Sequence, residues 1–375
     1  VDARYHAKAT AGVDTDTFTV TVNDGYGGTT TATVKVPIAP PSTAASAIDQ
    51  RGTTVAMNVQ EMYYYSQADT NKALDLLKAN GVDTIRILIP WAGVEPDDEK
   101  YDWSDIDRMV NAAVARNIKV LGVLNTTPDW AVAPGQPALS GRPGDPQQFA
   151  EYAGLVATRY AGKVSAYEIW NEPNGVQFWA PKPDAAQYTA LLKAAYPVLK
   201  AADPNAVVVA AGLGAVISAG NLTIDPVTYL QQMYTAGAAG NFDALSYHPY
   251  LYTKLFSTPS PYPSAPINQV EALHDLMVAN GDGNKKIWAT EYGEPAGLVS
   301  EASQASYIGD FLRTWRDLDY AGPAFIHTIR DYTSSSPNSA TFGVFRNDWS
   351  AKPAVGLIKT VINENKAIIA GTKYL

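Results

Sequence analysis

Short runs of β-branched and apolar residues alternate with longer segments of helical periodicity along most of the chain. These runs are expected to form eight strands, at residues 53–60, 83–91, 119–125, 164–170, 206–212, 242–248, 285–290 and 322–329. Between them, apolar residues recur every three or four positions, which is typical of helices covering one face of a sheet. One helix is expected to begin at Asp145-Pro146 and another to be capped by Ser104. Repeated strand–helix units predict a parallel sheet covered by helices.

The number of units indicates how the sheet closes. Eight strand–helix units over about 325 residues predict a (β/α)8 barrel. The alternative is a doubly wound open sheet, in which a glycine-rich phosphate-binding turn would usually follow an early strand. The sequence has no such turn, so the predicted fold class is α/β, with a TIM barrel over residues 51–375.

The first residues follow another pattern. Strict alternation over 17–22 and 29–36, around Asn23-Asp24-Gly25, predicts a β-hairpin within residues 1–37, and 38–50 is expected to be a Pro/Ala/Ser linker. The hairpin resembles the last two strands of the VCBS or cadherin-like repeats of exported bacterial proteins. That resemblance implies a remnant of a β-sandwich repeat in a secreted or cell-envelope-associated protein. Any secretory signal is expected to lie outside this sequence, which starts at Val1.

Composition narrows the possible partners. The 28 Lys and Arg residues against 37 Asp and Glu give a net charge of -9, which makes nucleic acid and anionic membranes poor partners. No window is long and apolar enough for a membrane span. The absence of cysteine excludes a thiolate nucleophile, a disulfide scaffold and a Cys-ligated metal. The oligomeric state stays open.

Two glutamates end predicted strands. Because reactive groups of a barrel sit at the carboxyl ends of its strands, Glu172 after the fourth strand and Glu291 after the seventh are candidate catalytic residues. Paired carboxylates suit glycosidic bond cleavage, in which one protonates the leaving oxygen and the other attacks or stabilises the sugar centre. Glu294 is a competitor for Glu291. The four histidines are too scattered to indicate a metal site, so no metal or cofactor is expected.

Roles follow from the expected surroundings of the two carboxylates. Glu291 must stay ionised, and Arg86 and the Tyr250 hydroxyl are plausible groups to hold it so. Glu172 must be protonated at rest, and the adjacent Asn171 suits a hydrogen bond to the sugar 2-hydroxyl.

Two motifs carry a family resemblance. Trp170-Asn171-Glu172-Pro173-Asn174, with Glu291 inside Trp288-Ala289-Thr290-Glu291-Tyr292-Gly293, resembles the clan A retaining glycoside hydrolases, closest to family 39 and next to family 5. The segments 81–86, 127–130 and 342–354 agree with it. The resemblance implies a carbohydrate substrate and double displacement with Glu172 as acid/base and Glu291 as nucleophile, roughly 5 Å apart.

Further contacts are implied by position. Arg86 and Tyr250 would contact the nucleophile, and Asn171 and His248 would face the sugar. Many family 5 members end the last strand in a tryptophan, whereas this chain has Ile329-Arg330-Asp331-Tyr332, so Arg330 and Asp331 are expected to contact an unusual sugar. Aromatic residues in the loops, Trp130 and Trp179 among them, could be sugar platforms.

Two alternatives stay open beside hydrolysis of a poly- or oligosaccharide. One is an inactive barrel that only binds carbohydrate. The other is a transglycosylase that uses the same two glutamates. The sugar and its linkage are open in each case.

Overall fold

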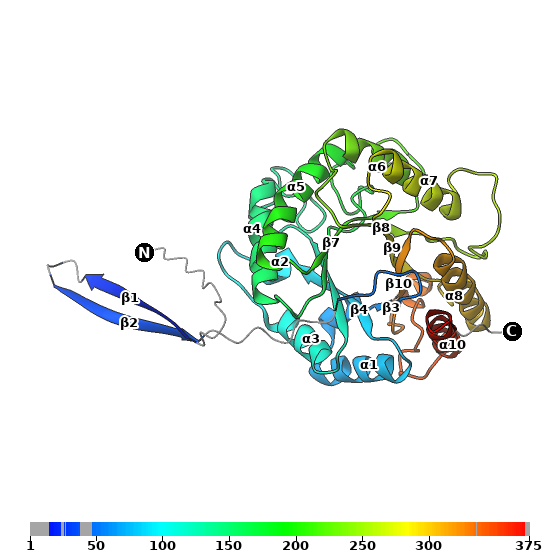
Figure 1. The fold of residues 1–375 in the computed structure, drawn as a ribbon, viewed down its shortest axis with the longest axis horizontal. Helices are drawn as coiled ribbons and strands as arrows, with labels where there is room; N and C mark the ends of the chain where they lie inside the picture. Colours follow the sequence, from blue (N-terminus) through cyan, green and yellow to red (C-terminus); the bar gives the residue numbers. More distant parts are fainter. Residues whose placement is uncertain (1–14, 24–25, 27, 38–46, 335, 372–375) are drawn as a thin grey trace. The chain divides into compact units, whose positions relative to one another are not determined.

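Eight parallel strands close into a barrel surrounded by helices (Figure 1). The computed structural model of the protein describes residues 15–23, 26, 28–37, 47–334 and 336–371. Around the barrel the order is β10-β3-β4-β5-β6-β7-β8-β9. The strands are β3 (Val55–Asn58), β4 (Thr84–Pro90), β5 (Lys119–Asn125), β6 (Ala166–Ile169), β7 (Val207–Gly214), β8 (Ala244–His248), β9 (Ile287–Tyr292) and β10 (Ala321–His327). The predicted (β/α)8 fold is confirmed, and each predicted strand end lies within two residues of the observed one.

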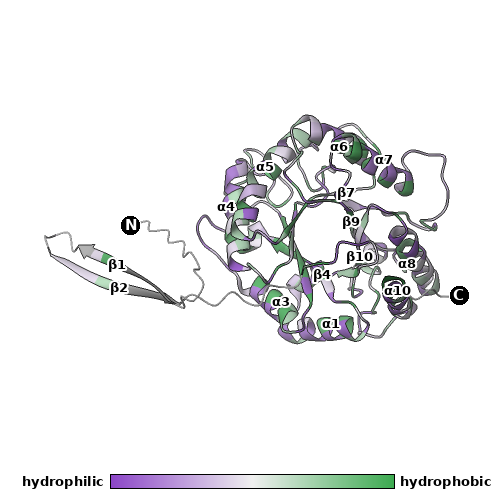
Figure 2. Cartoon of the chain, in the orientation of Figure 1, coloured by the Kyte–Doolittle hydropathy of each residue, from purple (hydrophilic) through white to green (hydrophobic). Residues whose placement is uncertain are grey.

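Helices follow the strands and cover the outside of the barrel. They are α1 (Gln67–Ala79), α3 (Ser104–Val114), α4 (Pro146–Arg159), α5 (Ala185–Ala202), α6 (Pro226–Thr235), α7 (Pro266–Ala279), α8 (Glu301–Arg316) and α10 (Pro353–Ile369), with the short η1 (Gln60–Tyr64), α2 (Trp91–Val94) and α9 (Pro337–Ala340). Figure 2 shows hydrophobic and hydrophilic residues mixed along these helices, as expected for elements with one buried face. Within the described residues, no helix has the length and apolar character needed to cross a membrane.

Two helix starts test the predicted caps. Asp145 caps α4, because its side chain accepts a hydrogen bond from the backbone of Gln147. Ser104 does not cap α3: it is the first residue of the helix, and its own backbone N–H donates to the side chain of Asp102. The predicted cap was therefore wrong: the N-cap residue is Trp103, which makes no side-chain cap, and the aspartate before it accepts the backbone hydrogen bond instead.

The barrel interior has two levels. Its lower level, here called the apolar floor, consists of Ile48, Ala56, Leu121, Ala166, Val207, Val209, Ala244, Trp288 and Phe325. Successive side chains of a strand point to opposite faces, so a residue two positions further along points inward again. In five strands the residue two positions after a floor residue is polar, and these residues form the polar layer, which consists of Asn58, Glu168, Ser246, Thr290 and His327. This layer lies on the side of the barrel where the strands end.

The chain divides into two compact units, residues 1–44 and 45–375. In the first, β1 (Thr15–Asn23) pairs antiparallel with β2 (Thr29–Pro37), as the hairpin prediction required. In the second, Ile48 is buried in the apolar floor, so the last residues of the predicted linker 38–50 belong to the barrel. Residues 38–46 lie outside the described residues. The origin of the hairpin in a sandwich repeat stays a prediction.

Candidate active site

The loop that follows β6 fixes the position of Glu172. Trp170 and Glu172 adopt left-handed backbone conformations, with φ of +70° and +44°, which non-glycine residues hold only where the surroundings enforce them. The backbone N–H of Glu172 donates to the carbonyl of Gly212 at 3.0 Å. The Asn174 amide exchanges hydrogen bonds with the Gly214 backbone at 2.9 and 3.0 Å. The loop is thereby tied to β7.

Glu291 lies near the end of β9, between two donors. Arg86 Nη1 donates to its Oε1 at 2.6 Å, and the Tyr250 hydroxyl donates to its Oε2 at 2.9 Å. The Arg86 side chain is 1% exposed and that of Glu291 10% exposed. The structure thus places Arg86 and Tyr250 beside the predicted nucleophile, on both of its oxygens.

The surroundings of Glu291 favour its ionised form. Burial raises the pKa of Glu291. The nearby His248, Arg86 and His327 and the hydrogen bond from Tyr250 lower it by more, so that the pKa falls to about 2. Burial raises the pKa of Tyr250 well above its usual value, so its hydroxyl keeps the proton that it donates. Glu291 is therefore a carboxylate at neutral pH, as a nucleophile requires.

Glu172 faces Glu291 across a short gap. Its Oε1 lies 2.8 Å from Nδ1 of His248, and its side chain is 24% exposed. Donor atoms of Glu172, His248 and Glu291 all lie within 4.8 Å of one another. Carboxyl groups of retaining glycosidases are about 5 Å apart, whereas those of inverting enzymes are at least about 6.5 Å apart to admit a water. The spacing matches the retaining arrangement.

His248 lies behind Glu172. Its side chain is fully buried, with Nδ1 on Glu172 and Nε2 2.9 Å from the Thr290 hydroxyl oxygen. Burial lowers the pKa of His248, but Glu291 and Glu172 raise it by more, and the net change is upward. The structure does not place His248 against a sugar, as the resemblance implied; the histidine contacts the carboxylate instead.

Glu168, which sequence reasoning missed, is fully buried within β6. Its Oε2 accepts from Arg86 Nε at 2.6 Å, and its Oε1 accepts from the Thr290 hydroxyl at 2.8 Å. Arg86 Nη2 donates to Oδ1 of Asn171 at 2.8 Å, so the amide nitrogen is the group that Asn171 can offer a ligand. One signal was available: Glu168 is a charged residue in the middle of a predicted buried strand, and a buried charge needs a partner.

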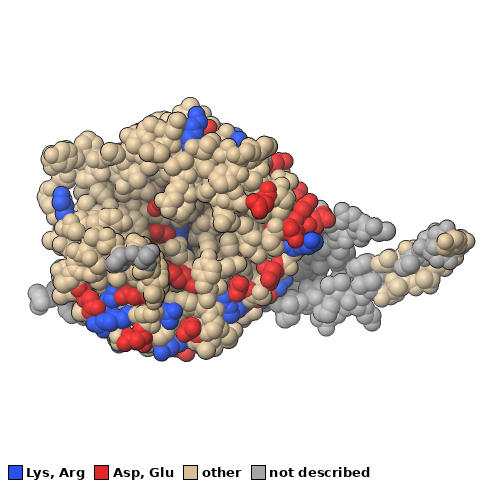
Figure 3. All heavy atoms as spheres, turned by 180° about the vertical axis from the view of Figure 1, so that it is seen from behind, with Lys and Arg blue, Asp and Glu red and all other residues tan. Residues whose placement is uncertain are grey.

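A cleft of about 1230 Å³ opens over these residues. Figure 3 shows one face of the barrel hollowed, with acidic and basic side chains inside the hollow and much of the surrounding surface uncharged. Many of the groups lining the cleft are aromatic or amide side chains, which suit sugar rings and hydroxyls. They include Gln60, Tyr64, Tyr65, Asn125, Asn171, Gln177, Phe178, Tyr250, Tyr252 and Tyr332.

Two predicted sugar platforms lie outside this lining. Trp179 is 1% exposed and packs edge-on against Trp170 in the core. Trp130 packs against Trp91 and donates from its indole N–H to the Glu95 carbonyl at 3.1 Å. The prediction for Trp179 was wrong, and the half-buried Trp130 is not in the cleft lining, because aromatic character does not indicate on which side of a loop a ring lies.

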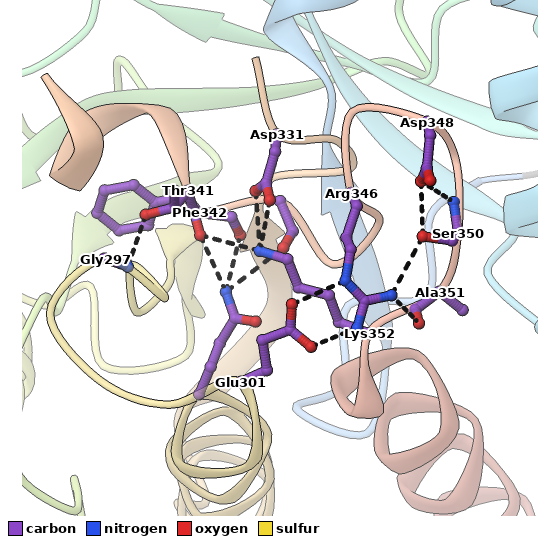
Figure 4. Close-up of polar contacts among 12 residues, drawn as sticks. Gly297, Glu301, Asp331, Thr341, Phe342, Arg346, Asp348, Ser350, Ala351 and Lys352 are labelled. Carbon is purple, nitrogen blue, oxygen red and sulfur yellow. Dashed lines mark hydrogen bonds and ion pairs between the residues drawn. The ribbon is translucent and has the colours of Figure 1, made fainter. Parts of the chain in front are cut away.

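Asp331 also lies outside the cleft lining. Its carboxylate binds Lys352 Nζ at 2.8 and 2.9 Å, in a cluster next to the Arg346–Glu301 pair (Figure 4). The prediction that Asp331 contacts a sugar was wrong, because its carboxylate forms an ion pair with a buried lysine.

At the end of β10, the side chains that line the cleft are those of Arg330 and His327. Arg330 lines the cleft, with its guanidinium carbon 4.7 Å from the ring centre of Tyr65 and 4.4 Å from that of Trp349. His327 also lines the cleft and was missed, because β10 ends there, two residues before the predicted end. Its Nδ1 lies 3.1 Å from the Asn58 amide nitrogen.

The position of Glu294, the competitor for Glu291, rules it out as the nucleophile. Glu294 is fully buried, absent from the cleft lining, and accepts from the Thr253 backbone N–H at 3.1 and 3.2 Å. Among the described residues, Glu172, His248 and Glu291 are the group whose donor atoms are close enough for a metal ion. The guanidinium of Arg86, 2.6 Å from Glu291, would repel a cation bound there.

Comparisons with known proteins point to one class. A family model described as cellulase (glycosyl hydrolase family 5) matches residues 48–329. Endo-1,4-beta-xylanase C of Paenibacillus barcinonensis is 27% identical over 147 residues, which are 35% of this chain. This chain spans only 13% of that protein's length.

Solved structures share the barrel. A family 39 glycoside hydrolase from Bacteroides cellulosilyticus WH2 superposes with a TM-score of 0.68 at 23% identity, covering 93% of this chain and 70% of that one. A GH5_18 protein from Streptomyces cattleya, solved with GlcNAc, gives a TM-score of 0.63 at 15% identity, covering 86% and 81%. At these identities the likeness concerns the fold.

Proposed function

Because the chain belongs to glycosyl hydrolase family 5, we propose that it hydrolyses glycosidic bonds of a poly- or oligosaccharide with retention of configuration. Glu291 acts as nucleophile and Glu172 as acid/base. One observation carries the proposal: two carboxylates within 4.8 Å face one cleft, and a buried arginine keeps one of them ionised.

In the first step, an oxygen of Glu291 attacks the anomeric carbon while the bond to the leaving oxygen breaks. The proton of Glu172 goes to that oxygen, which leaves as an alcohol. Glu291 is then an ester, and Glu172 a carboxylate. The amide nitrogen of Asn171 is placed to donate to the sugar 2-hydroxyl.

In the second step, the carboxylate of Glu172 takes a proton from water, and the water oxygen attacks the same carbon. The ester bond breaks and Glu291 leaves as a carboxylate. Arg86 and Tyr250, which already hold both of its oxygens, stabilise the charge that develops on leaving. The protein returns to its first state.

The shape of the cleft supports an oligomeric substrate. Tyr64, Tyr65 and Arg330 line it on the side of β3 and β10, and Phe178 and Gln177 line it beyond β6. Stacking of sugar rings on these aromatic side chains would hold units on both sides of the scissile bond. Arg330 offers its guanidinium to hydroxyl or acidic groups of the sugar.

We also propose that the protein acts outside the cytoplasm, where a polymeric glycan would be met. The support is the hairpin that resembles the repeats of exported proteins. Immunodetection in culture medium, envelope and cytoplasmic fractions of the source cells would test this, and a purely cytoplasmic signal would contradict it.

The test uses substitutions of the two carboxylates. We expect Glu291→Gln to abolish turnover of every cleaved glycan. Glu172→Ala should still be glycosylated by activated aryl glycosides, and azide should release a glycosyl azide of retained configuration. Glu294→Gln is the matched control, because Glu294 is a buried carboxylate three residues from Glu291 that does not line the cleft.

Other outcomes separate the alternatives. A glycosyl azide of inverted configuration, or wild-type activity in Glu291→Gln, would overturn the mechanism. Binding without turnover over a broad panel of plant and bacterial envelope glycans would favour a carbohydrate-binding barrel. Transfer products that dominate at high acceptor concentration would favour a transglycosylase.

A further inference from the structure

A third carboxylate stands behind the two that double displacement uses. Glu168 lies in β6, four residues before Glu172, and its side chain has no exposed surface. A buried charge is costly unless it is paired and hydrogen-bonded. The double displacement gives Glu168 no step, so its retention in the barrel needs another reason.

The first path from Glu168 leads to Glu291. Arg86 Nε donates to Glu168 at 2.6 Å, while Nη1 of the same guanidinium donates to Glu291 at 2.6 Å. Because the guanidinium is a planar and rigid fork, anchoring Nε fixes the direction of Nη1. Glu168 therefore anchors the group that holds Glu291.

The second path leads to Glu172 through Thr290 and His248. The Thr290 hydroxyl has one hydrogen, and the carboxylate of Glu168, 2.8 Å away, can only accept it. Two other groups contact that oxygen, Ser246 Oγ at 2.5 Å and His248 Nε2 at 2.9 Å, and both must then be donors to it. A neutral His248 thus carries its hydrogen on Nε2 and presents the lone pair of Nδ1 to Glu172, 2.8 Å away.

We propose that Glu168 is a positioning residue that fixes which nitrogen of His248 is protonated, and thereby holds the catalytic proton between Nδ1 and Glu172. That this proton takes part in catalysis rests on the proposed function. Where the proton is held follows from the hydrogen bonds alone. The negative charge of Glu168 also favours keeping the proton on the Glu172–His248 pair.

Strand β7 lies close to the hydrogen bonds that join Glu168, Thr290 and His248. Gly212 of β7 has φ of +52°, and a Cβ there would come within 2.8 Å of Glu168 Oε1 and 3.1 Å of His248 Nε2. Any side chain would be strained and would press on both groups. A glycine at this position is what close approach of β7 to the Glu168–Thr290–His248 path requires.

The first arm of the test needs no substrate. The full chain is labelled with ¹⁵N-histidine, and the signal of His248 is assigned by its loss in His248→Gln. At a pH where the ring is neutral, we expect Nε2 to be protonated and Nδ1 bare. In Glu168→Gln, the amide can donate to Thr290, whose hydrogen is then released to Nε2 or to Ser246 Oγ, so we expect the Nδ1-protonated form to appear beside the wild-type one. A wild-type ring protonated at Nδ1 would overturn the proposal.

The second arm is the pH profile of kcat/KM on a glycan that the wild type cleaves. Removal of the Glu168 charge should move the basic limb, where the proton of the pair is lost, to lower pH by about one unit. The other charged or titratable groups around His248 remain in both proteins: Arg86 from β4, Glu172 after β6, Tyr250 after β8, Glu291 from β9 and His327 from β10. The shift therefore reports Glu168.

Matched variants separate this role from a structural one. Glu294→Gln removes an equally buried carboxyl and should leave the basic limb in place, and Thr290→Ser, which keeps the hydroxyl, should keep the wild-type tautomer of His248. If Glu168→Gln does not fold, Thr290→Val replaces it, with the same expected change of tautomer. A folded Glu168→Gln with an unshifted limb would overturn the proposal. A wild type without turnover would contradict the proposed function, while the ¹⁵N arm would still decide the position of the proton.

Discussion

Two buried cations of this protein are surrounded by similar groups but differ in how their charge is balanced. Lys352, 1% exposed, pairs with Asp331 and also donates to the Thr341 carbonyl at 3.2 Å (Figure 4). Arg86, equally buried, lies between Glu168 and Glu291 and also donates to Asn171. The Lys352 cluster is closed, with one carboxylate for one cation. The Arg86 cluster has an additional carboxylate, and that carboxylate faces the cleft.

The pKa values follow this difference. Burial raises the pKa of Asp331, although Lys352 lowers it in part. Burial also raises the pKa of Glu291, but His248, Arg86 and His327 reverse the change and bring the pKa to about 2. In the closed pair burial outweighs the lysine, so the pair keeps a buried charge balanced, whereas the carboxylate of Glu291 is held ionised beside a cleft and is prepared for chemistry.

The largest effect is expected from Lys352→Met. The substitution leaves Asp331 without its cation, and loss of one partner of a buried pair costs about 3–5 kcal/mol of unfolding free energy. Urea unfolding at pH 7 would measure this loss. The kcat/KM of the folded fraction should stay near the wild-type value. Lys359→Met, on the exposed face of α10, is the control and should change stability by less than about 0.5 kcal/mol. A large fall in kcat/KM would show that the two clusters are not separate.

Arg86→Lys should have the next largest effect, on activity. Lysine keeps the positive charge but cannot bind Glu168, Glu291 and Asn171 at once with a rigid fork. We expect kcat/KM to fall about 100-fold, which corresponds to about 2.7 kcal/mol of transition-state stabilisation. Steady-state kinetics on protein shown to be folded by near-ultraviolet circular dichroism would measure it. Arg116→Lys is a control away from the cleft, because Arg116 binds Asp75 of α1 and neither residue lines the cleft.

Tyr250→Phe should have the smallest effect of the three. It removes one hydrogen bond to Glu291, worth about a tenfold decrease in kcat/KM. That bond helps to lower the pKa of Glu291, so the pKa rises in the variant. The acid limb of the pH profile should therefore move to higher pH, and the loss of activity should grow as the pH falls. Tyr292→Phe, a buried tyrosine outside the cleft lining, should show neither change.

Much of the fold follows from local pattern. The β-branched runs and the helical periodicities between them predict eight strands that the structure places within two residues. The Asn-Glu-Pro context singles out Glu172, and the strand-end rule singles out Glu291, because both signals are local in sequence. Arg86 and Tyr250 could be predicted beside Glu291 from the strands that end around it.

Other parts of the site depend on contacts that the sequence does not display. Glu168 becomes meaningful only when Arg86 and Thr290, 82 and 122 residues away, are brought to it. Asp331 is removed from the cleft by Lys352, a partner that adjacent residues do not reveal. Trp179 and Tyr65 have the same aromatic character, yet the first is core and the second lines the cleft.

The division of the barrel interior has a consequence for protein engineering. The apolar floor and the polar layer share strands, but their members lie two positions apart, as Ala166 and Glu168 or Trp288 and Thr290 do, so floor positions can be varied without replacing a member of the polar layer. A library of variants confined to the apolar floor would search for changes in thermal stability. A library confined to the cleft loops would search for changes in substrate specificity. The layer between them should be kept constant in both libraries, because it connects the scaffold to the two carboxylates.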